Sequence, residues 1–220
     1  MPISILDLKE PLEGPLAPVS RELWDQVARR FADQVTISAA LGECEQALEL
    51  AAEVPRAFTF AKAGPARCGT VNRLTGYWES LKERLPSHVA LVAVAYADHL
   101  AAQCPPPLAI LEHAAALGMK TWLIDTFHKD GRSTLDHMNP ASLRAIDRMA
   151  KANSAKWVMA GTLRLSHLNQ FIASCTDPRR YPLPDLFGVR SDICKAMRGG
   201  DICPTKVAKW LSTMPQLGCQ

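Results

Sequence analysis

Residues 108–127, which read LAILEHAAALGMKTWLIDTF, form a complete helix-to-strand unit. The apolar spacing over Leu108–Leu117 predicts a helix, and Gly118 is suited to end it because glycine adopts the left-handed conformation without strain. The apolar run Thr121–Phe127 then predicts a buried strand. A near-continuously apolar strand that follows a helix so closely is typical of a parallel sheet covered by helices.

Apolar runs and amphipathic stretches alternate in the same way along the rest of the chain. The predicted strands cover Ile3–Lys9, Val35–Leu41, Ala57–Gly64, His88–Tyr96, Thr121–Phe127, Trp157–Gly161 and Leu186–Arg190. One helix is predicted to begin at Ser20, and the others cover Glu43–Val54, Val71–Leu85, Leu108–Leu117, Ser142–Ala152, Ser166–Ser174 and Thr205–Met214.

This alternation fits both a doubly wound sheet and a (β/α) barrel of the TIM type. Two features favour the barrel: polar residues capable of chemistry end nearly every strand, and no GxGxxG turn follows the first strand. We therefore predict a single α/β barrel domain over residues 1–220, with seven strands where a complete TIM barrel has eight.

Composition and charge argue against several classes of protein. The net charge is only +3, and the basic residues are scattered, so nucleic-acid binding is not expected. The seven cysteines include no CxxC pair and the six histidines are dispersed, which argues against a disulfide scaffold and a metal site. No leader segment, membrane-spanning run or GxSxG motif is visible. We expect a cytoplasmic protein that acts on a small molecule, without a membrane partner.

Asp7 and Lys9 stand two residues apart in the first predicted strand, so both side chains leave the same face. In a barrel, polar residues on the inner face at the carboxyl end of a strand point into the active site. The alternative is an exposed edge strand with a polar outer face.

Further charged residues end other predicted strands. Lys62 closes an apolar strand before Gly64-Pro65, and Asp125 ends the strand that Lys129 follows by one short loop. Asp98 comes just after the strand that ends at Tyr96. We expect all four at the mouth of the barrel; the alternatives are a lysine extended along the sheet rim, a solvated turn at Asp130-Gly131 and a helix cap at Asp98.

The last two strands end in loops suited to phosphate. Gly161-Thr162 and Gly188-Val189-Arg190 follow these strands. In (β/α) barrels the loops after the final strands commonly bind phosphate through backbone N–H groups, and glycine allows the close approach.

Several lysines around one cavity would allow imine chemistry. A lysine amine attacks a carbonyl only when it is neutral, and burial or a second ammonium nearby favours the neutral form. Lys9, with Lys62 and Lys129 as neighbours, is our candidate for the Schiff-base lysine. Asp7 or Asp125 could then move protons as the imine forms and loses water.

Six segments in order resemble one known family. Leu6–Ala17 resembles its "DVKNPKEGSLGA" segment, Phe60–Gly64 its "IKVG" and Ala95–Asp98 its "GYAD". Leu123–Gly131 is similar to its "LDTxxKDG" and Ala160–Leu163 to its "AGS" segment. Phe187–Arg190, with Cys194 and Lys195 beyond, is similar to its "GVRGAACxGG" segment. The family is (5-formylfuran-3-yl)methyl phosphate synthase, also called 4-(hydroxymethyl)-2-furancarboxaldehyde-phosphate synthase. The matches extend over nearly the whole chain.

The resemblance implies a specific reaction. The family condenses two molecules of glyceraldehyde 3-phosphate into a furan phosphate, a precursor of methanofuran-type C1 carriers, without metal or organic cofactor. Its Schiff-base lysine aligns with Lys9 and its proton-transferring lysine with Lys62. Asp7, Asp125 and Lys129 align with other polar pocket residues, and the loops at Gly161-Thr162 and Gly188–Arg190 would hold phosphate.

The sequence departs from the family at two places. The family has a βα unit before the strand that contains Asp7, so we expect a barrel without its first βα unit. An upstream reading frame could supply the unit, another chain could complete the barrel, or the protein could be a degenerate, non-catalytic subunit; a homo-oligomer is our expectation. Ser191-Asp192-Ile193 replaces small residues of the phosphate loop. Another class I aldolase or dehydratase of phosphorylated carbonyl compounds is the alternative activity.

Overall fold

The computed structural model describes residues 3–171, 180–196 and 199–213. Within them, seven strands form one sheet in the order of the chain. The strands are β1 (Ile5–Leu8), β2 (Thr36–Glu43), β3 (Phe60–Gly64), β4 (Ala90–Tyr96), β5 (Thr121–Asp125), β6 (Lys156–Met159) and β7 (Leu186–Phe187). Every neighbouring pair is parallel. The parallel α/β architecture predicted from the sequence is confirmed.

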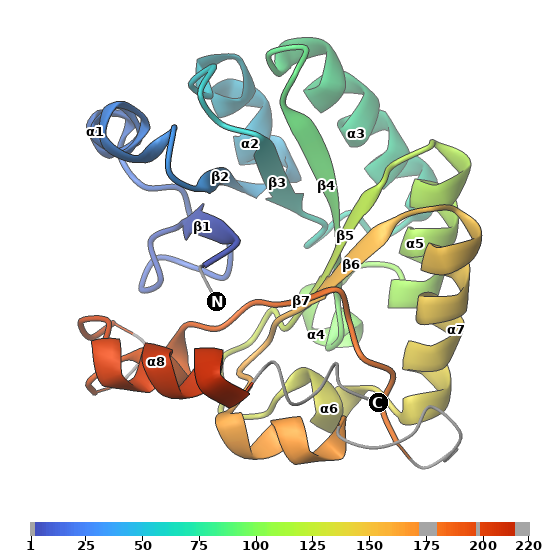
Figure 1. Cartoon of the computed structure of the whole chain (residues 1–220). Coiled ribbons are helices and arrows are strands. Elements are labelled where there is room, and N and C mark those ends of the chain that lie inside the picture. The colour runs from blue at the N-terminus through green and yellow to red at the C-terminus, as the bar shows by residue number, and fades with distance from the viewer. Residues whose placement is uncertain (1–2, 172–179, 197–198, 214–220) are drawn as a thin grey trace.

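The sheet curls like the wall of a barrel, with the longer helices on its outer side (Figure 1). These helices are α1 (Arg21–Phe31), α2 (Cys44–Leu50), α3 (Val71–Arg84), α5 (Pro107–Ala116) and α7 (Pro140–Ala152). In the described ranges, β1 pairs only with β2 and β7 only with β6, so the curl stays open between β1 and β7. This is the seven-stranded, incomplete barrel expected from the sequence.

Shorter elements cluster in the connections. They are α4 (His99–Ala102), α6 (Thr134–His137) and the 3-10 helices η1 (Ala51–Glu53), η2 (Leu165–Gln170) and η3 (Ser191–Ile193). The last helix, α8 (Pro204–Thr213), lies beside β7 and the amino-terminal end of the chain (Figure 1). No helix in the described ranges combines the length and apolarity needed to cross a bilayer.

Local sequence explains where several helices begin and end. The Ser20 hydroxyl accepts a hydrogen bond from the backbone N–H of Leu23 at 3.3 Å, which caps α1 as expected. Asn139 caps α7 in the same way, and Pro140 occupies its first turn. Gly118 ends α5 with φ +68°, the left-handed conformation expected there.

Four tryptophans hold the helices against the sheet. Trp24 and Trp78 lie on α1 and α3, whereas Trp122 and Trp157 lie on β5 and β6; each is at most 1% exposed. Replacing one such buried ring by alanine typically costs about 3–5 kcal/mol, so these residues contribute much of the core's stability.

Several predicted boundaries are wrong at the carboxyl ends of strands. β2 continues through Glu43, where a helix was expected to begin, because Glu43 pairs with Gly64 on β3 beyond a bulge. β6 and β7 are shorter than predicted; Arg190, with φ −131° and ψ −63°, turns the chain into η3. The helix predicted over Ser166–Ser174 is a 3-10 helix that ends at Gln170, and residues 172–174 lie outside the described ranges.

Candidate active site

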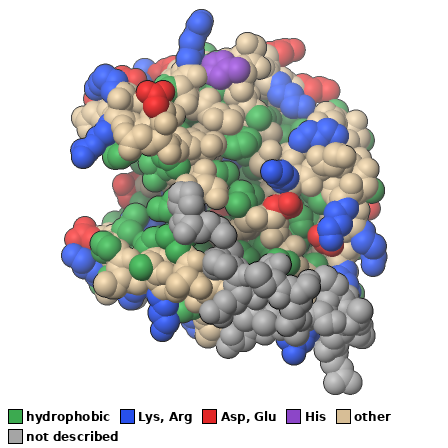
Figure 2. All heavy atoms as spheres, in the orientation of Figure 1, with side chains coloured by type: hydrophobic (Ala, Val, Ile, Leu, Met, Phe, Trp, Pro, Cys, Tyr) green, Lys and Arg blue, Asp and Glu red, His purple; other side chains and the backbone are tan. Residues whose placement is uncertain are grey.

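A cavity of about 440 Å³ lies inside the curl of the sheet. The predicted residues Asp7, Lys9, Lys62, Asp125 and Lys129 all line it. Figure 2 shows the hollow on the side of β1 and α8, with apolar side chains on its visible walls. The cavity therefore combines a cluster of charged residues with apolar walls.

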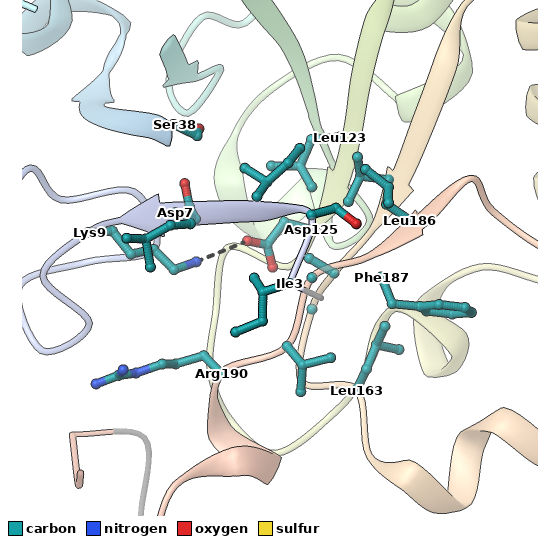
Figure 3. A pocket seen from close by; sticks show the side chains of 18 of the residues that line it. Ile3, Asp7, Lys9, Ser38, Leu123, Asp125, Leu163, Leu186, Phe187 and Arg190 are labelled. Carbon is teal, nitrogen blue, oxygen red and sulfur yellow. Dashed lines mark ion pairs between the residues drawn. The ribbon is translucent and has the colours of Figure 1, made fainter. Parts of the chain in front are cut away.

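The charged residues come from three strands and from the segments that follow two of them. Lys62 on β3 pairs with Asp7 on β1, with 2.6 Å between Nζ and Oδ1. Lys9 follows β1 and reaches toward Asp125 at the end of β5, at 3.8 Å (Figure 3). Lys129 pairs with the other oxygen of Asp125 at 2.7 Å. Three lysines and two aspartates leave the cluster with a net positive charge when all are ionised, which suits a phosphorylated ligand.

The side-chain alternation predicted for the first strand holds in part. Asp7 and Lys9 both face the cavity, as the spacing of two residues requires. Leu6 also lines the cavity, although regular alternation would direct it to the face opposite Asp7. The open side of β1 explains this, because the cavity extends around an edge that no strand covers in the described ranges.

Burial and nearby lysines act in opposite directions on the two carboxyl groups. Burial raises the pKa of Asp125, but the charges of Lys129 and Lys9 outweigh it and hold that pKa at about 2. Burial also raises the pKa of Asp7, and the charges of Lys62 and Lys9 again lower it below its ordinary value. Both aspartates are therefore carboxylates at neutral pH.

Lys62 is the most enclosed amine of the cluster, with a side chain 8% exposed. Burial lowers the pKa of its ammonium group, and the charge of Asp7 only partly offsets this. Its neutral form is thus more accessible than that of a surface lysine. This property suits a group that must take up and return a proton.

The Lys129 side chain is fixed by its own loop as well as by Asp125. Its ammonium group donates to the carbonyl oxygen of Thr126 at 2.5 Å and lies 3.1 Å from the Thr126 hydroxyl. Gly131, with φ +94°, makes the turn that was the alternative explanation of this segment. The turn and the cavity position of Lys129 occur together.

Asp98 has a different position from the one we expected. Its carboxylate accepts the backbone N–H groups of Phe127 at 2.6 Å and of His128 at 2.8 Å, and it is not among the residues that line the cavity. It precedes α4 without a side-chain cap, so the capping alternative is also wrong. Asp98 instead orders the loop that carries Lys129.

The two loops predicted to bind phosphate both reach the cavity. Gly161 and Thr162 follow β6, and Gly188, Val189 and Arg190 follow β7; all five line it. Gly161 and Thr162 have positive φ angles of 88° and 51°. Phosphate binding at these loops stays a prediction that their placement supports.

A substitution at Gly161 should test how tightly the loop after β6 is packed. A methyl group there would overlap the Thr134 hydroxyl and lie 2.9 Å from the Thr126 nitrogen. We expect Gly161→Ala to lower the free energy of unfolding by about 2–3 kcal/mol, through strain at positive φ together with overlap. Urea unfolding measures the loss.

Gly118 offers a matched control for that measurement. It also has positive φ, 68°, but a methyl group there would meet nothing within 4 Å. Gly118→Ala should therefore show only the conformational cost of about 1 kcal/mol. If both variants lost the same free energy of unfolding, the surroundings of Gly161 would not be closely packed.

One polar residue of the site was not predicted, and another has a role that differs from the predicted one. Ser38 lines the cavity on β2 opposite Asp7, and its hydroxyl helps to lower the pKa of the Asp7 carboxyl. Asp192, which we had placed in the phosphate loop, accepts the backbone N–H of Leu165 at 2.9 Å and the indole N–H of Trp210 at 2.8 Å. Its charge therefore holds α8 and η2 together. A lone serine in an apolar strand was the only sequence clue to Ser38.

Within the described ranges, no group of three or more histidine, cysteine, aspartate or glutamate side chains is arranged to hold a metal ion.

A solved structure shares this architecture. Phosphoribosyl anthranilate isomerase from Thermus thermophilus superposes with a TM-score of 0.52 at 14% identity, over 95% of this chain and 88% of that one. At this identity the likeness concerns the fold alone, and it supports an α/β barrel.

Curated relatives cover nearly the full length. A (5-formylfuran-3-yl)methyl phosphate synthase from Archaeoglobus fulgidus is 25% identical, over 96% of this chain and 90% of its own. A protein from Kitasatospora aureofaciens, named as a putative enzyme of the same kind, is 28% identical over 96% of this chain and 85% of its own. The family model described as 4-HFC-P synthase matches residues 2–211. The chain therefore belongs to the 4-HFC-P synthase family of enzymes.

Proposed function

We propose that this protein condenses two molecules of glyceraldehyde 3-phosphate into (5-formylfuran-3-yl)methyl phosphate, with loss of phosphate and water, through an imine on Lys9. The product would serve the biosynthesis of a methanofuran-type C1 carrier. The observation that carries the proposal is the cluster Lys9–Asp125–Lys129 beside Lys62–Asp7, in one cavity of a member of this family.

Each group has a role that its surroundings support. Lys9 attacks the substrate carbonyl, and Asp125, 3.8 Å away, takes and returns the protons of imine formation. The imine makes the adjacent carbon acidic. Lys62, paired with Asp7, removes that proton to give an enamine, which attacks the carbonyl of the second molecule. Arg190 and the loops at Gly161 and Gly188 hold phosphate.

Lys62 is the alternative nucleophile, since burial favours its neutral amine. Lys9 is preferred for two reasons. Its side chain is twice as exposed as that of Lys62, at 16% against 8%. Lys62 also lies only 2.6 Å from Asp7, and attack on a substrate would break that contact.

The test combines product analysis with chemical trapping. We expect the purified protein, given glyceraldehyde 3-phosphate, to release phosphate and form a compound with the ultraviolet absorbance and mass of the furan phosphate. Borohydride added during turnover should reduce the imine and leave a stable adduct on the peptide that contains Lys9. Borohydride without substrate is the control for non-specific modification.

The outcomes separate the proposal from its alternatives. A trapped adduct with a product that lacks the furan chromophore would indicate another class I aldolase or dehydratase. An adduct on Lys62 would reassign the nucleophile. If protein that remains folded shows neither turnover nor adduct, the proposal is overturned and a non-catalytic binding subunit is favoured.

A further inference from the structure

A second polar group, outside the cavity lining, connects three strands behind Lys62. The Glu43 carboxylate, at the end of β2, accepts a hydrogen bond from the Tyr96 hydroxyl on β4 at 2.8 Å. Its other oxygen accepts the backbone N–H of Ala66, in the loop after β3, also at 2.8 Å. Tyr96 is fully buried. The carboxylate therefore joins the ends of β2, β3 and β4.

A bulge in β2 brings Glu43 to this place. Ala40 pairs with Lys62, but Glu43 pairs with Gly64, so three steps on β2 face two on β3. Gly42 lies within the irregular segment, with φ +90°. Bulges of this kind re-aim a side chain that regular pairing would direct elsewhere. Here the bulge directs Glu43 across the end of β3.

Gly64 leaves the space that Glu43 and Tyr96 occupy. A methyl group at Gly64 would overlap both the Glu43 carboxylate and the Tyr96 hydroxyl. Gly64 follows Lys62 by two residues on the same strand, so its missing side chain would share the face that Lys62 presents to the cavity. The pair thus fills the layer directly beyond Lys62 on this strand.

The protonation of the pair is consistent with this arrangement. Burial raises the pKa of Tyr96, and the Glu43 charge raises it further. The hydroxyl therefore stays protonated and donates a hydrogen bond to Glu43. Burial also raises the pKa of Glu43, against the two hydrogen bonds that lower it. Tyr96 lies opposite Asp125 in the sheet, and the Ala97 N–H donates to the Asp125 carbonyl at 2.8 Å. Tyr96 therefore stands on β4, between the strands that carry Lys62 and Asp125, and Glu43 reaches it from β2 across the end of β3.

We propose that Glu43 and Tyr96 are a positioning pair for Lys62: they exclude water from the layer beyond its ammonium group and keep the end of β3 aligned with Asp7. The effect on the protonation of Lys62 is a property of the folded protein and does not depend on a substrate. Only the consequence for turnover rests on the proposed function.

The test measures Lys62 directly, without substrate. In protein labelled with ¹³C-lysine, the Lys62 Cε resonance is the one absent from Lys62→Arg, and its titration reports the local pKa. Tyr96→Phe removes the hydrogen bond from the hydroxyl. Glu43→Gln leaves only one acceptor oxygen for two donors, because its amide nitrogen cannot accept. Each variant should therefore loosen the pair, let water in and move this pKa upward, toward that of an exposed lysine, by about one unit. Turnover should fall about tenfold, whereas the borohydride adduct on Lys9 should still form.

Tyr77→Phe is the matched control. The Tyr77 hydroxyl donates to Glu45 at 2.8 Å, the same length as the Tyr96–Glu43 hydrogen bond, but on the exposed side of α3. It should leave the Lys62 titration unchanged. Should Tyr96→Phe fail to fold, Glu43→Gln, which keeps the side-chain shape, carries the test.

A Lys62 titration that is the same in wild type, Tyr96→Phe and Glu43→Gln would overturn the proposal. A shifted titration in a protein that does not turn over glyceraldehyde 3-phosphate would support the positioning pair and reject only the proposed function.

Discussion

Lys9→Ala is expected to abolish the borohydride adduct and to reduce turnover of glyceraldehyde 3-phosphate about a thousandfold or more, because it removes the nucleophile itself. Stability should change little. Lys9 lies 3.8 Å from Asp125, which keeps its closer partner Lys129 at 2.7 Å. Mass spectrometry of the reduced protein, steady-state rates and urea unfolding measure the three quantities.

Two further variants define what the loss means. Lys9→Arg keeps the positive charge near Asp125 but cannot form an imine, so it should be as inactive as Lys9→Ala. Lys156→Ala removes an exposed lysine from the opposite end of the sheet and should leave both rate and adduct unchanged. An adduct that forms normally in Lys9→Ala would contradict the assignment of the nucleophile.

Asp125→Asn should reduce turnover about 100-fold, since an amide cannot exchange protons with the attacking amine. It should also lower the free energy of unfolding by about 2–3 kcal/mol, because two lysines remain around a buried group without charge. Asp125 is 2% exposed, so water cannot replace the missing carboxylate. Steady-state rates and urea unfolding at neutral pH check both effects.

The stability effect should depend on pH with a definite sign. The pKa of Asp125 is about 2 in the folded protein against an ordinary 3.8, so ionisation of this group favours the folded state. The contribution, about 2 kcal/mol, is complete above pH 4 and is lost as the pH falls toward 2. Wild type and Asp125→Asn should therefore differ in stability at pH 7 and converge in acid.

Asp130→Asn provides the control for a surface pair. Asp130 lies in the same loop and pairs with Arg132 at 2.8 Å, but 40% of its side chain is exposed. Solvent screens such a pair, so the substitution should have little effect at any pH. If Asp130→Asn lost as much stability as Asp125→Asn, burial would not be the reason why the ion pairs of Asp125 contribute to stability.

The sequence predicted the groups that lie at strand ends. Parallel strands bring their carboxyl ends to one edge of the sheet, and this edge can be predicted from the alternation of strands and helices along the chain. The side chains at this edge therefore lie together; they are Asp7, Lys9, Lys62 and Asp125. The order of the sheet was equally accessible, since each strand pairs with the next along the chain.

The groups that the sequence did not reveal depend on tertiary contacts. Glu43 looked like the first residue of a helix, and only its pairing with Gly64 extends β2 that far. Asp98 looked like a cavity residue, but the backbone N–H groups of Phe127 and His128 take up its carboxylate. Neither partner is close in sequence, so no local pattern could have identified them.

Because Gly64 has no side chain, the residues at positions 43, 64 and 96 share one limited volume. Glu43 and Tyr96 can keep their places only while position 64 bears no side chain. Substitutions at these positions should therefore be correlated: a larger residue at 64 requires a smaller one at 43 or 96. Anyone redesigning this barrel would have to exchange the three together, as a set of constant size, to leave the lysine beside them undisturbed.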